Sequence, residues 1–304
     1  MADPVPGPGW AVLRVEAAGL CHSDLHVMHG APYVSHTPIV LGHEVAGTIL
    51  ALGEGDSAGF SVGDPVGVGL LSHPHGASQG FAPGLSADGG FAELILAPLF
   101  ALVPIPDGVS FGQAAVATDS IATAYHAVLS TGAVGKDQTV GVIGLGGLGL
   151  NGVAVAHNAG ARVYGVDVNA AAFETARQLG AIDCFSDASE LRDVRPDVII
   201  DFAGMGTTTA AAVEAVRTGG RVVLVGLGAN EVTINGPSLV ARSIQLLGSL
   251  GADKDDLIAI YGEIAAGRLR PVIEEIRFSE LPEGYERLER GEVKGRLVVR
   301  NLAE

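Results

Sequence analysis

Cysteine is nearly absent from this 304-residue chain, in which Cys21 and Cys184 are the only two. Two cysteines cannot build a disulfide framework, and such sparing use is typical of proteins from a reducing compartment. Cys184 lies in the apolar context of residues 182–185, where an inert core thiol is expected. The cysteine content therefore indicates an intracellular, cytoplasmic protein whose fold depends on its core.

The sequence also lacks long apolar runs and an excess of positive charge. No run reaches the roughly eighteen apolar residues that a membrane span requires, and no basic segment precedes an apolar signal core. The formal net charge of -16 opposes attraction to nucleic acid phosphates and to anionic membrane surfaces. We therefore expect neither nucleic acid nor a membrane among the partners of this protein.

Hydrophobic residues are plentiful, at 48%, which is typical of a globular protein with much buried sheet, and the length suits two domains. Up to about residue 120 the pattern is glycine-rich and mostly β. The elements expected there are strands at 10–15, 39–49, 63–66 and 91–97 and a helix at 112–129.

Beyond residue 131, strands and helices alternate in the βαβ rhythm of a parallel sheet. The elements expected there are strands at 139–143, 162–166, 197–202, 221–226 and 244–248 and helices at 150–158, 170–179, 207–217 and 253–266. Residues 274–302 are strand-rich again and should rejoin the first domain. The expected fold class is α/β, with a mostly-β domain of residues 1–120 and 268–304 and a doubly wound, six-stranded parallel sheet in residues 121–267.

A glycine-rich turn, GLGGLG at residues 144–149, follows the apolar strand 139–143 and opens the next helix. Gly144 permits the tight turn, Gly146 lets the backbone approach a pyrophosphate, and Gly149 lets the helix pack on the strand. The N-terminus of that helix then faces the anion. The context of the turn predicts dinucleotide binding.

The next strand ends in Val166-Asp167. A carboxylate at this position can accept hydrogen bonds from both ribose hydroxyls of adenosine and repels a 2′-phosphate. No arginine or lysine follows immediately, because residues 168–170 are Val, Asn and Ala. This arrangement favours NAD over NADP.

A second chemical segment, CHSDLH at residues 21–26, is followed by Gly42-His43-Glu44. It combines a thiolate, imidazoles, a hydroxyl and carboxylates, which a catalytic metal site needs to polarise an oxygen and move its proton. We expect the function to arise where this segment meets the nucleotide-binding turn.

With both segments considered, the chain resembles a zinc-dependent alcohol dehydrogenase of the medium-chain dehydrogenase/reductase superfamily, over residues 12–299. The matching residues are AGLCHSDLH at 18–26, LGHE at 41–44, GD at 63–64, GGFAE at 89–93, GLGGLG at 144–149, VD at 166–167 and GR at 295–296. The resemblance implies a GroES-like catalytic domain and a Rossmann NAD-binding domain. It also implies hydride transfer between a small-molecule alcohol, or its aldehyde or ketone, and NAD.

The resemblance implies one catalytic zinc per chain, held by Cys21 and His43, with Glu44 behind the metal or exchanging onto it. Asp24 would orient His43. At the position of the family's remaining ligand the donor is Asp119, for which a helix N-cap is the structural alternative. The cysteines that hold a second, structural zinc in many members are missing, because residues 63–90 contain no cysteine.

The family pattern also implies a proton relay. Zinc would lower the pKa of the alcohol, Ser23 would accept its proton, and the nicotinamide ribose would pass the proton to His26, while the alkoxide gives its hydride to NAD. The further coenzyme contacts implied are His22 and Arg296 at the pyrophosphate, Thr123 and Leu148 at the nicotinamide, and the turn residues Gly144, Gly146, Gly147 and Gly149.

Three matters stay open at this point. Strands near residues 244–249 often pair across a two-fold axis in such proteins, so we expect a homodimer or homotetramer. One alternative function is a zinc-free quinone or double-bond reductase of the same superfamily, whose members generally lack the cysteine and histidine pair. Another is a non-catalytic NAD-binding protein that kept the fold.

Overall fold

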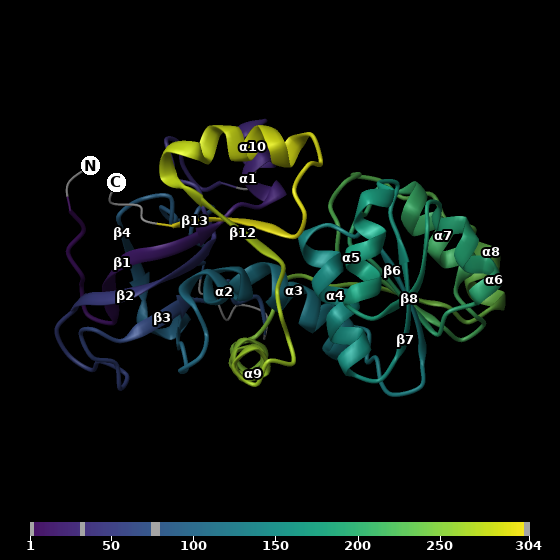
Figure 1. Cartoon of the computed structure of the whole chain (residues 1–304), viewed down its shortest axis with the longest axis horizontal. Helices are drawn as coiled ribbons and strands as arrows, with labels where there is room; N and C mark the ends of the chain where they lie inside the picture. Colours follow the sequence, from purple (N-terminus) through teal and green to yellow (C-terminus); the bar gives the residue numbers. More distant parts are fainter. Residues whose placement is uncertain (1–2, 31–33, 74–79, 301–304) are drawn as a thin grey trace. The chain divides into compact units, whose positions relative to one another are not determined.

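The computed structural model describes residues 3–30, 34–73 and 80–300, and the chain divides into two compact units (Figure 1). The first unit contains residues 1–122 and 251–304, and the second contains residues 123–250. The α/β fold class, with a mostly-β domain and a parallel-sheet domain, is confirmed.

The first unit is built on a seven-stranded sheet in the order β12-β13-β1-β2-β3-β5, with β4 paired to β1. Its strands are β1 (Trp10–Gly19), β2 (Glu44–Leu52), β3 (Pro65–Val68), β4 (Leu94–Pro98), β5 (Leu102–Pro104), β12 (Ile273–Arg277) and β13 (Arg296–Arg300). All pairs are antiparallel except β12 with β13. The C-terminal strand β13 lies directly beside β1, as the strand-rich tail predicted.

Two local features of this unit differ from the sequence prediction and help to form the site. The expected strand at 39–49 begins only at Glu44, because Gly42 has a positive φ of 95° that interrupts an extended chain. Residues 22–28, for which no helix was predicted, form the short helix α1 (His22–Met28).

The helical segment expected at 112–129 runs from Phe111 to Thr131 but changes its winding three times. It consists of α2 (Phe111–Val116), a π-helical stretch (Ala117–Ile121), α3 (Ala122–Tyr125) and a second π-helical stretch (His126–Thr131). Widened π turns inside α-helices are frequently found at functional sites.

Helix α9 (Lys254–Ala265), which was expected in the nucleotide-binding domain, belongs to the first unit. Tyr261 is fully buried there and donates a hydrogen bond to the carbonyl of Ala114 at 3.2 Å. Nζ of Lys254 donates to the carbonyl of Phe100 at 3.2 Å. These contacts with the first unit explain why the division falls before this helix.

The second unit is a six-stranded, fully parallel sheet in the order β11-β10-β9-β6-β7-β8. Its strands are β6 (Thr139–Ile143), β7 (Arg162–Val166), β8 (Ala181–Phe185), β9 (Val198–Asp201), β10 (Arg221–Leu224) and β11 (Gln245–Gly248). Its helices are α4 (Gly147–Asn158), α5 (Phe173–Gln178), α6 (Leu191–Val194), α7 (Thr207–Ala215) and α8 (Gly236–Ala241). The count of six strands is confirmed, and β8 is the one whose position was not predicted.

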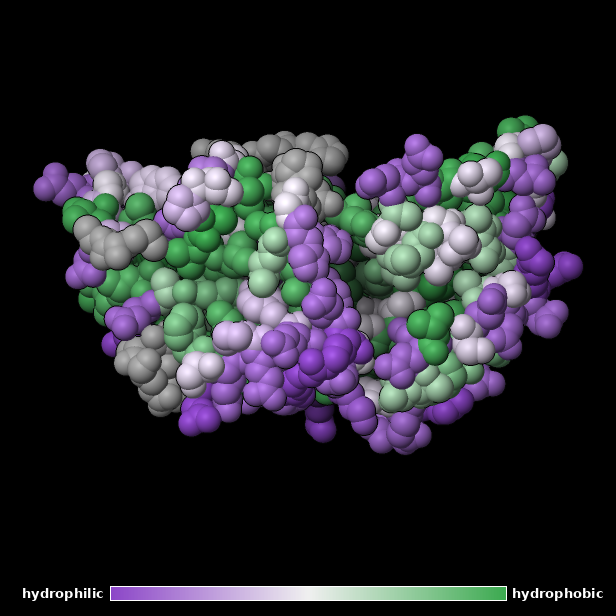
Figure 2. Space-filling view, turned by 90° about the horizontal axis from the view of Figure 1, so that it is seen from above, coloured by the Kyte–Doolittle hydropathy of each residue, from purple (hydrophilic) through white to green (hydrophobic). Residues whose placement is uncertain are grey.

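Figure 2 shows that hydrophobic residues remain on the surface of both units beside strongly hydrophilic ones. The most exposed large hydrophobic side chains of the second unit are Val168, Val240 and Leu250. Within the described residues, no helix combines the length and the apolar character that crossing a membrane would need.

Candidate active site

Cys21 ends the loop after β1 and is the N-cap of α1, with extended φ and ψ of -125° and 154°. Its backbone N–H donates to Oδ2 of Asp24 at 3.0 Å, which anchors the buried Asp24 carboxylate at the start of the helix. This exchange is one half of a capping box, the pattern that satisfies free N–H groups at a helix start. Local helix capping therefore fixes the thiol and the carboxylate together.

His43 follows the Gly42 turn and is almost completely buried. Its Nδ1 lies 3.2 Å from Oδ1 of Asp24, and its Nε2 lies 3.4 Å from Oδ2 of Asp119. Burial alone would lower the pKa of His43, but the negative charges of Asp24 and Cys21 raise it well above its usual value. Because Nδ1 faces the Asp24 carboxylate, the other nitrogen is the one available as a metal ligand.

Asp119 lies inside the π-helical stretch Ala117–Ile121, whose N-cap is Val116. The structure therefore does not place Asp119 at a helix N-cap, the structural alternative considered from the sequence. Its Oδ2 is 3.9 Å from Sγ of Cys21, and the side chain is largely buried.

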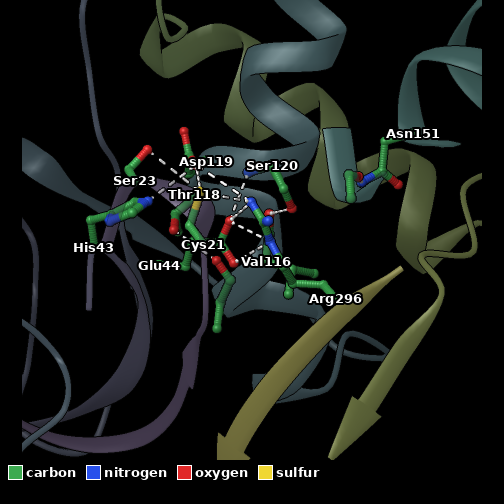
Figure 3. Close-up of polar contacts among 12 residues, drawn as sticks. Cys21, Ser23, His43, Glu44, Val116, Thr118, Asp119, Ser120, Asn151 and Arg296 are labelled. Carbon is green, nitrogen blue, oxygen red and sulfur yellow. Dashed lines mark hydrogen bonds and ion pairs between the residues drawn. The ribbon is translucent and has the colours of Figure 1, made fainter. Parts of the chain in front are cut away.

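Glu44 and Arg296, the first residues of β2 and β13, form a buried ion pair behind this cluster (Figure 3). The guanidinium donates to both carboxylate oxygens at 2.6 to 3.1 Å, and its Nη2 also lies 3.3 Å from Sγ of Cys21. The amide of Ser120 donates to Oε1 of Glu44 at 3.2 Å. Burial raises the pKa of Glu44 to about 7, even though the charge of Arg296 acts in the opposite direction.

The donor set fits a zinc ion. Ligand atoms of Cys21, His43, Glu44 and Asp119 all lie within 4.8 Å of one another. Zinc–ligand bonds of about 2.0–2.3 Å in a tetrahedron place neighbouring ligand atoms about 3.3–3.6 Å apart. The contacts of Asp119 with His43 and Cys21, at 3.4 and 3.9 Å, are near that range. One sulfur, one nitrogen and carboxylate oxygens are donors that zinc accepts.

Ser23, His22 and His26 are arranged along α1 beside this cluster. Oγ of Ser23 lies 3.6 Å from Sγ of Cys21, so the hydroxyl is at the edge of the ligand set (Figure 3). Loss of hydration lowers the pKa of His22, and the positive charges of Arg296 and His26 lower it further. The structure thus brings Ser23, one of the two predicted relay residues, to the predicted ligand Cys21. Arg296 is directed to Glu44 and Cys21, and its contact with a pyrophosphate stays a prediction.

The glycine turn of the second unit has the backbone that its sequence predicted. Gly144 has a φ of 84°, which favours glycine, and a Cβ on Gly149 would overlap the carbonyl oxygen of Gly144. In contrast, nothing lies within 4 Å of where a Cβ on Gly146 would be. Gly146 is the N-cap of α4, so there is open space at the helix start, where an anion would be bound.

Asp167, directly after β7, connects this turn to an adjoining cleft. Its Oδ2 accepts the amide of Leu145 at 2.6 Å, and its Oδ1 accepts the amide of Asn169 at 2.8 Å. The cleft has a volume of about 300 Å³ and lies at the carboxyl ends of the strands. Its lining residues are Ile143, Gly144, Val166, Asp167, Val168, Ser186, Asp187, Ala188, Ala203, Met205, Thr207, Thr208 and Ala211. The combination of glycine turn, acidic strand end and cleft fits the adenosine part of NAD.

One side of this cleft was not predicted from the sequence. It is lined by Ser186, Asp187 and Met205. Ser186 and Asp187 follow β8, the strand whose position was not predicted, and the apolar residues at 181–185 give only a weak signal because Asp183 interrupts them. Thr123 is buried in α3 and Leu148 is partly buried in α4; neither lines the cleft, and their nicotinamide contacts stay predictions.

Comparisons with known proteins identify the family of this chain. A family model described as an alcohol dehydrogenase GroES-like domain matches residues 7–107, and one described as a zinc-binding dehydrogenase matches residues 147–265. An alcohol dehydrogenase from Geobacillus stearothermophilus is 30% identical over 314 residues, covering 96% of this chain and 92% of that protein.

Solved structures are similar over the whole length of the chain. An acetophenone reductase from Geotrichum candidum NBRC 4597, in complex with NAD, has 31% identity and a TM-score of 0.90, covering 100% of this chain and 93% of that one. A cobalt- and zinc-bound alcohol dehydrogenase from Pyrobaculum aerophilum has 25% identity and a TM-score of 0.87, covering 99% and 94%.

Proposed function

Because this chain belongs to the zinc-type alcohol dehydrogenases of the medium-chain dehydrogenase/reductase superfamily, we propose that it is an NAD-dependent alcohol dehydrogenase with one catalytic zinc. It transfers a hydride between a small alcohol, or its aldehyde or ketone, and NAD. The observation that carries the proposal is the buried cluster of Cys21, His43, Glu44 and Asp119, whose ligand atoms converge to within 4.8 Å.

Each side chain of the first unit then has a distinct task. Cys21, His43 and Asp119 hold the metal, and Asp24 keeps the His43 ring in position from its other nitrogen. Zinc bound there supplies a Lewis acid that polarises the substrate oxygen. Glu44 is held behind the metal position by its ion pair with Arg296. Its carboxylate oxygen lies within 4.8 Å of the other ligand atoms, so it can move onto the metal.

Proton movement is assigned to α1. Ser23 receives the hydroxyl proton of the substrate, since its Oγ is at the edge of the ligand set. His26 is one helical turn further along; with NAD bound, it would take up the proton through the nicotinamide ribose hydroxyl and release it to water. The second unit binds NAD through the turn Gly144, Gly146, Gly147 and Gly149 and through Asp167 at the ribose.

Metal analysis of the purified protein, combined with a scan of NAD reduction over primary, secondary and cyclic alcohols, tests the proposal. We expect one zinc per chain and hydride transfer with at least one alcohol class. Zinc without hydride transfer would favour a binding role, and hydride transfer without zinc would favour a zinc-free reductase; either result overturns the proposal.

Two cysteine variants provide a matched comparison. Cys21→Ser should lose bound zinc and activity together, because a hydroxyl is a poor replacement for a thiolate ligand. Cys184→Ser should keep both, since its thiol contacts the Phe173 carbonyl in the second unit and belongs to no ligand cluster found among the described residues. Unchanged zinc and turnover in Cys21→Ser would contradict the proposal.

Assembly and location complete the proposal. β11 is an end strand of the second-unit sheet, and Leu250 just beyond it is 68% exposed. Such an edge suits pairing with a second copy across a two-fold axis, so we infer a homodimer or homotetramer, which sedimentation analysis can distinguish from a monomer. Both cysteines are free thiols, which suits the cytoplasm.

A further inference from the structure

Buried polar atoms without well-aligned partners are concentrated beside the ligand cluster. In the part of the chain that the structure describes, four buried side-chain atoms have no hydrogen bond of standard geometry. Three of them lie together: Oδ1 of Asp24, Nδ1 of His43 and the hydroxyl of Tyr285. Such atoms are few in native structures and usually mark strain, catalysis or an ion.

Tyr285 reaches this place from α10 (Leu281–Glu289), which packs against α1 (Figure 1). The ring meets the ring of Phe91 edge to face, with centroids 6.1 Å apart and an interplanar angle of 85°. Phe91 in turn packs so closely on Gly42 that a Cβ there would be 2.9 Å from the ring. The ring of Tyr285 is therefore fixed by the same contacts that shape the turn before His43.

The hydroxyl of Tyr285 interacts with the carboxylate of Asp24. Burial raises the pKa of Tyr285, and the charge of Asp24 together with a loosely aligned hydrogen bond to it raises the pKa further. The phenol is consequently protonated at neutral pH and can act as a donor. Oδ2 of Asp24 already accepts from the Cys21 amide, whereas Oδ1 faces Nδ1 of His43 at 3.2 Å.

Packing alone does not account for this hydroxyl. A phenylalanine ring would fill the same space and make the same contact with Phe91 without burying a polar atom. The only partner that the described contacts give the hydroxyl is Asp24. Its presence therefore points to a role connected with that carboxylate.

We propose that Tyr285 is a positioning residue for the metal site, which holds Asp24 by hydrogen bonding and through it fixes the ring of His43. The chain of contacts runs from the Tyr285 hydroxyl to Asp24, from Asp24 to Nδ1 of His43, and from Nε2 of His43 to the metal position. Without the hydroxyl, the Asp24 carboxylate is held only by the Cys21 amide at Oδ2, so the oxygen that faces Nδ1 of His43 is placed less firmly. The inference rests on the proposed zinc site.

Tyr285→Phe tests the proposal, with Tyr261→Phe as the matched control. Tyr261 is a buried tyrosine of the same unit whose hydroxyl donates to the Ala114 carbonyl and not to Asp24 or a ligand atom. Partners that orient metal ligands typically change metal affinity or activity by about 10–100-fold. We expect Tyr285→Phe to lose zinc to a chelator about tenfold faster than wild type and to shift the visible absorption bands of the cobalt-substituted protein.

The control separates a metal effect from a loss of packing. Tyr261→Phe should lower the midpoint of urea unfolding but leave the rate of zinc loss and the cobalt spectrum unchanged. Tyr285→Phe should also be non-additive with Asp24→Asn in the rate of zinc loss, because both changes interrupt one chain of contacts. If Tyr285→Phe proves too unstable, Phe91→Leu can replace it, because this change loosens the tyrosine ring. The cobalt spectrum of Phe91→Leu is then compared with that of wild type, and the spectrum of Asp24→Asn with that of the double variant.

The outcomes are distinguishable. Wild-type zinc loss and an unchanged cobalt spectrum in Tyr285→Phe overturn the positioning role but leave the proposed zinc site intact. Equal effects of the two tyrosine variants on zinc loss also overturn it, since the effect would then be general destabilisation. A wild-type protein that binds neither zinc nor cobalt overturns the proposed function itself.

Discussion

Nη2 of Arg296 lies 2.6 Å from Oε1 of Glu44, although the two residues are 252 positions apart in the sequence. Both side chains are almost completely buried, and the same guanidinium lies 3.7 Å from Oδ2 of Asp119. Without Arg296, the carboxylates of Glu44 and Asp119 and the thiol of Cys21 would form a buried set of acidic groups. The guanidinium therefore offsets the charge of the ligands that would bind the metal.

Arg296→Met should destabilise the protein by about 3–5 kcal/mol, because it leaves the Glu44 carboxylate buried without its partner. Arg287→Met is the control: Arg287 pairs with Glu274 at 2.7 Å, but both side chains are partly exposed. Exposed pairs contribute about 0–1 kcal/mol, so the control should cost little. Urea unfolding of metal-free protein measures both values, and equal losses would contradict the role assigned to Arg296.

The ion pair also shows what the sequence can and cannot reveal about the site. The spacing of Cys21, Ser23 and His26 along one short segment, and the resemblance that it carries, predicted the ligand and relay residues. The partner of Glu44 could not be predicted, because Glu44 and Arg296 meet only when β2 and β13 lie on either side of β1. The family resemblance assigned Arg296 to the coenzyme, whereas its contacts in the structure are with Glu44 and Cys21.

Substitution by alanine should lower stability at one glycine of the nucleotide turn and NADH binding at another. A Cβ on Gly149 would meet the Gly144 carbonyl, so Gly149→Ala should cost about 1–3 kcal/mol even without coenzyme. Gly146 has an ordinary φ of -80° and open space beside it, so Gly146→Ala should fold normally but bind NADH weakly. Urea unfolding without coenzyme and a fluorescence titration with NADH measure the two effects. Normal NADH binding by Gly146→Ala would count against the pyrophosphate position.

Asp167→Asn should reduce the preference for NAD over NADP, measured as the ratio of kcat/KM values, by about tenfold, or roughly 1.4 kcal/mol. The amide oxygen can still accept from Leu145, which holds the turn, while the hydrogen bond from Asn169 and the charge that repels a 2′-phosphate are lost. Asp187→Asn is the matched control, because Asp187 lines the same cleft but caps the turn at Ser189. An equal change in both variants would indicate a general effect of charge in the cleft.

The nucleotide-binding unit was the more predictable of the two, for a physical reason. Its turn and Asp167 lie within one βαβ unit, where short-range geometry determines contacts. β8 was missed because Ile182 and Asp183 are exposed, so the strand has neither a fully apolar run nor a regular alternation. Helix α9 groups with the first unit through contacts that the sequence does not reveal, such as Tyr261 with Ala114, because these residues are distant in the sequence.

Asp197 should give the second unit a stability that depends on pH. Partial burial would raise its pKa, but hydrogen bonds from the Thr139 amide at 2.7 Å and from Nε of Arg217 at 2.6 Å outweigh that effect and lower the pKa. A carboxyl with a lowered pKa in the folded state stabilises above its unfolded pKa of about 3.9 and loses this contribution as the pH falls through its folded value. Asp197→Asn should therefore cost about 1–2 kcal/mol at pH 7 and progressively less below about pH 4.

Urea unfolding of wild type and Asp197→Asn at several pH values between 7 and 3 checks the sign of this dependence. Arg217→Met should reproduce only part of the loss at pH 7, because the Thr139 amide still donates to Oδ2 of Asp197. The Asp197 carboxylate connects the start of β6 with the residue before β9. Its charge should therefore contribute more to the stability of the sheet than an exposed ion pair does. A difference between wild type and Asp197→Asn that grows as the pH falls would contradict the lowered pKa and the hydrogen bonds that explain it.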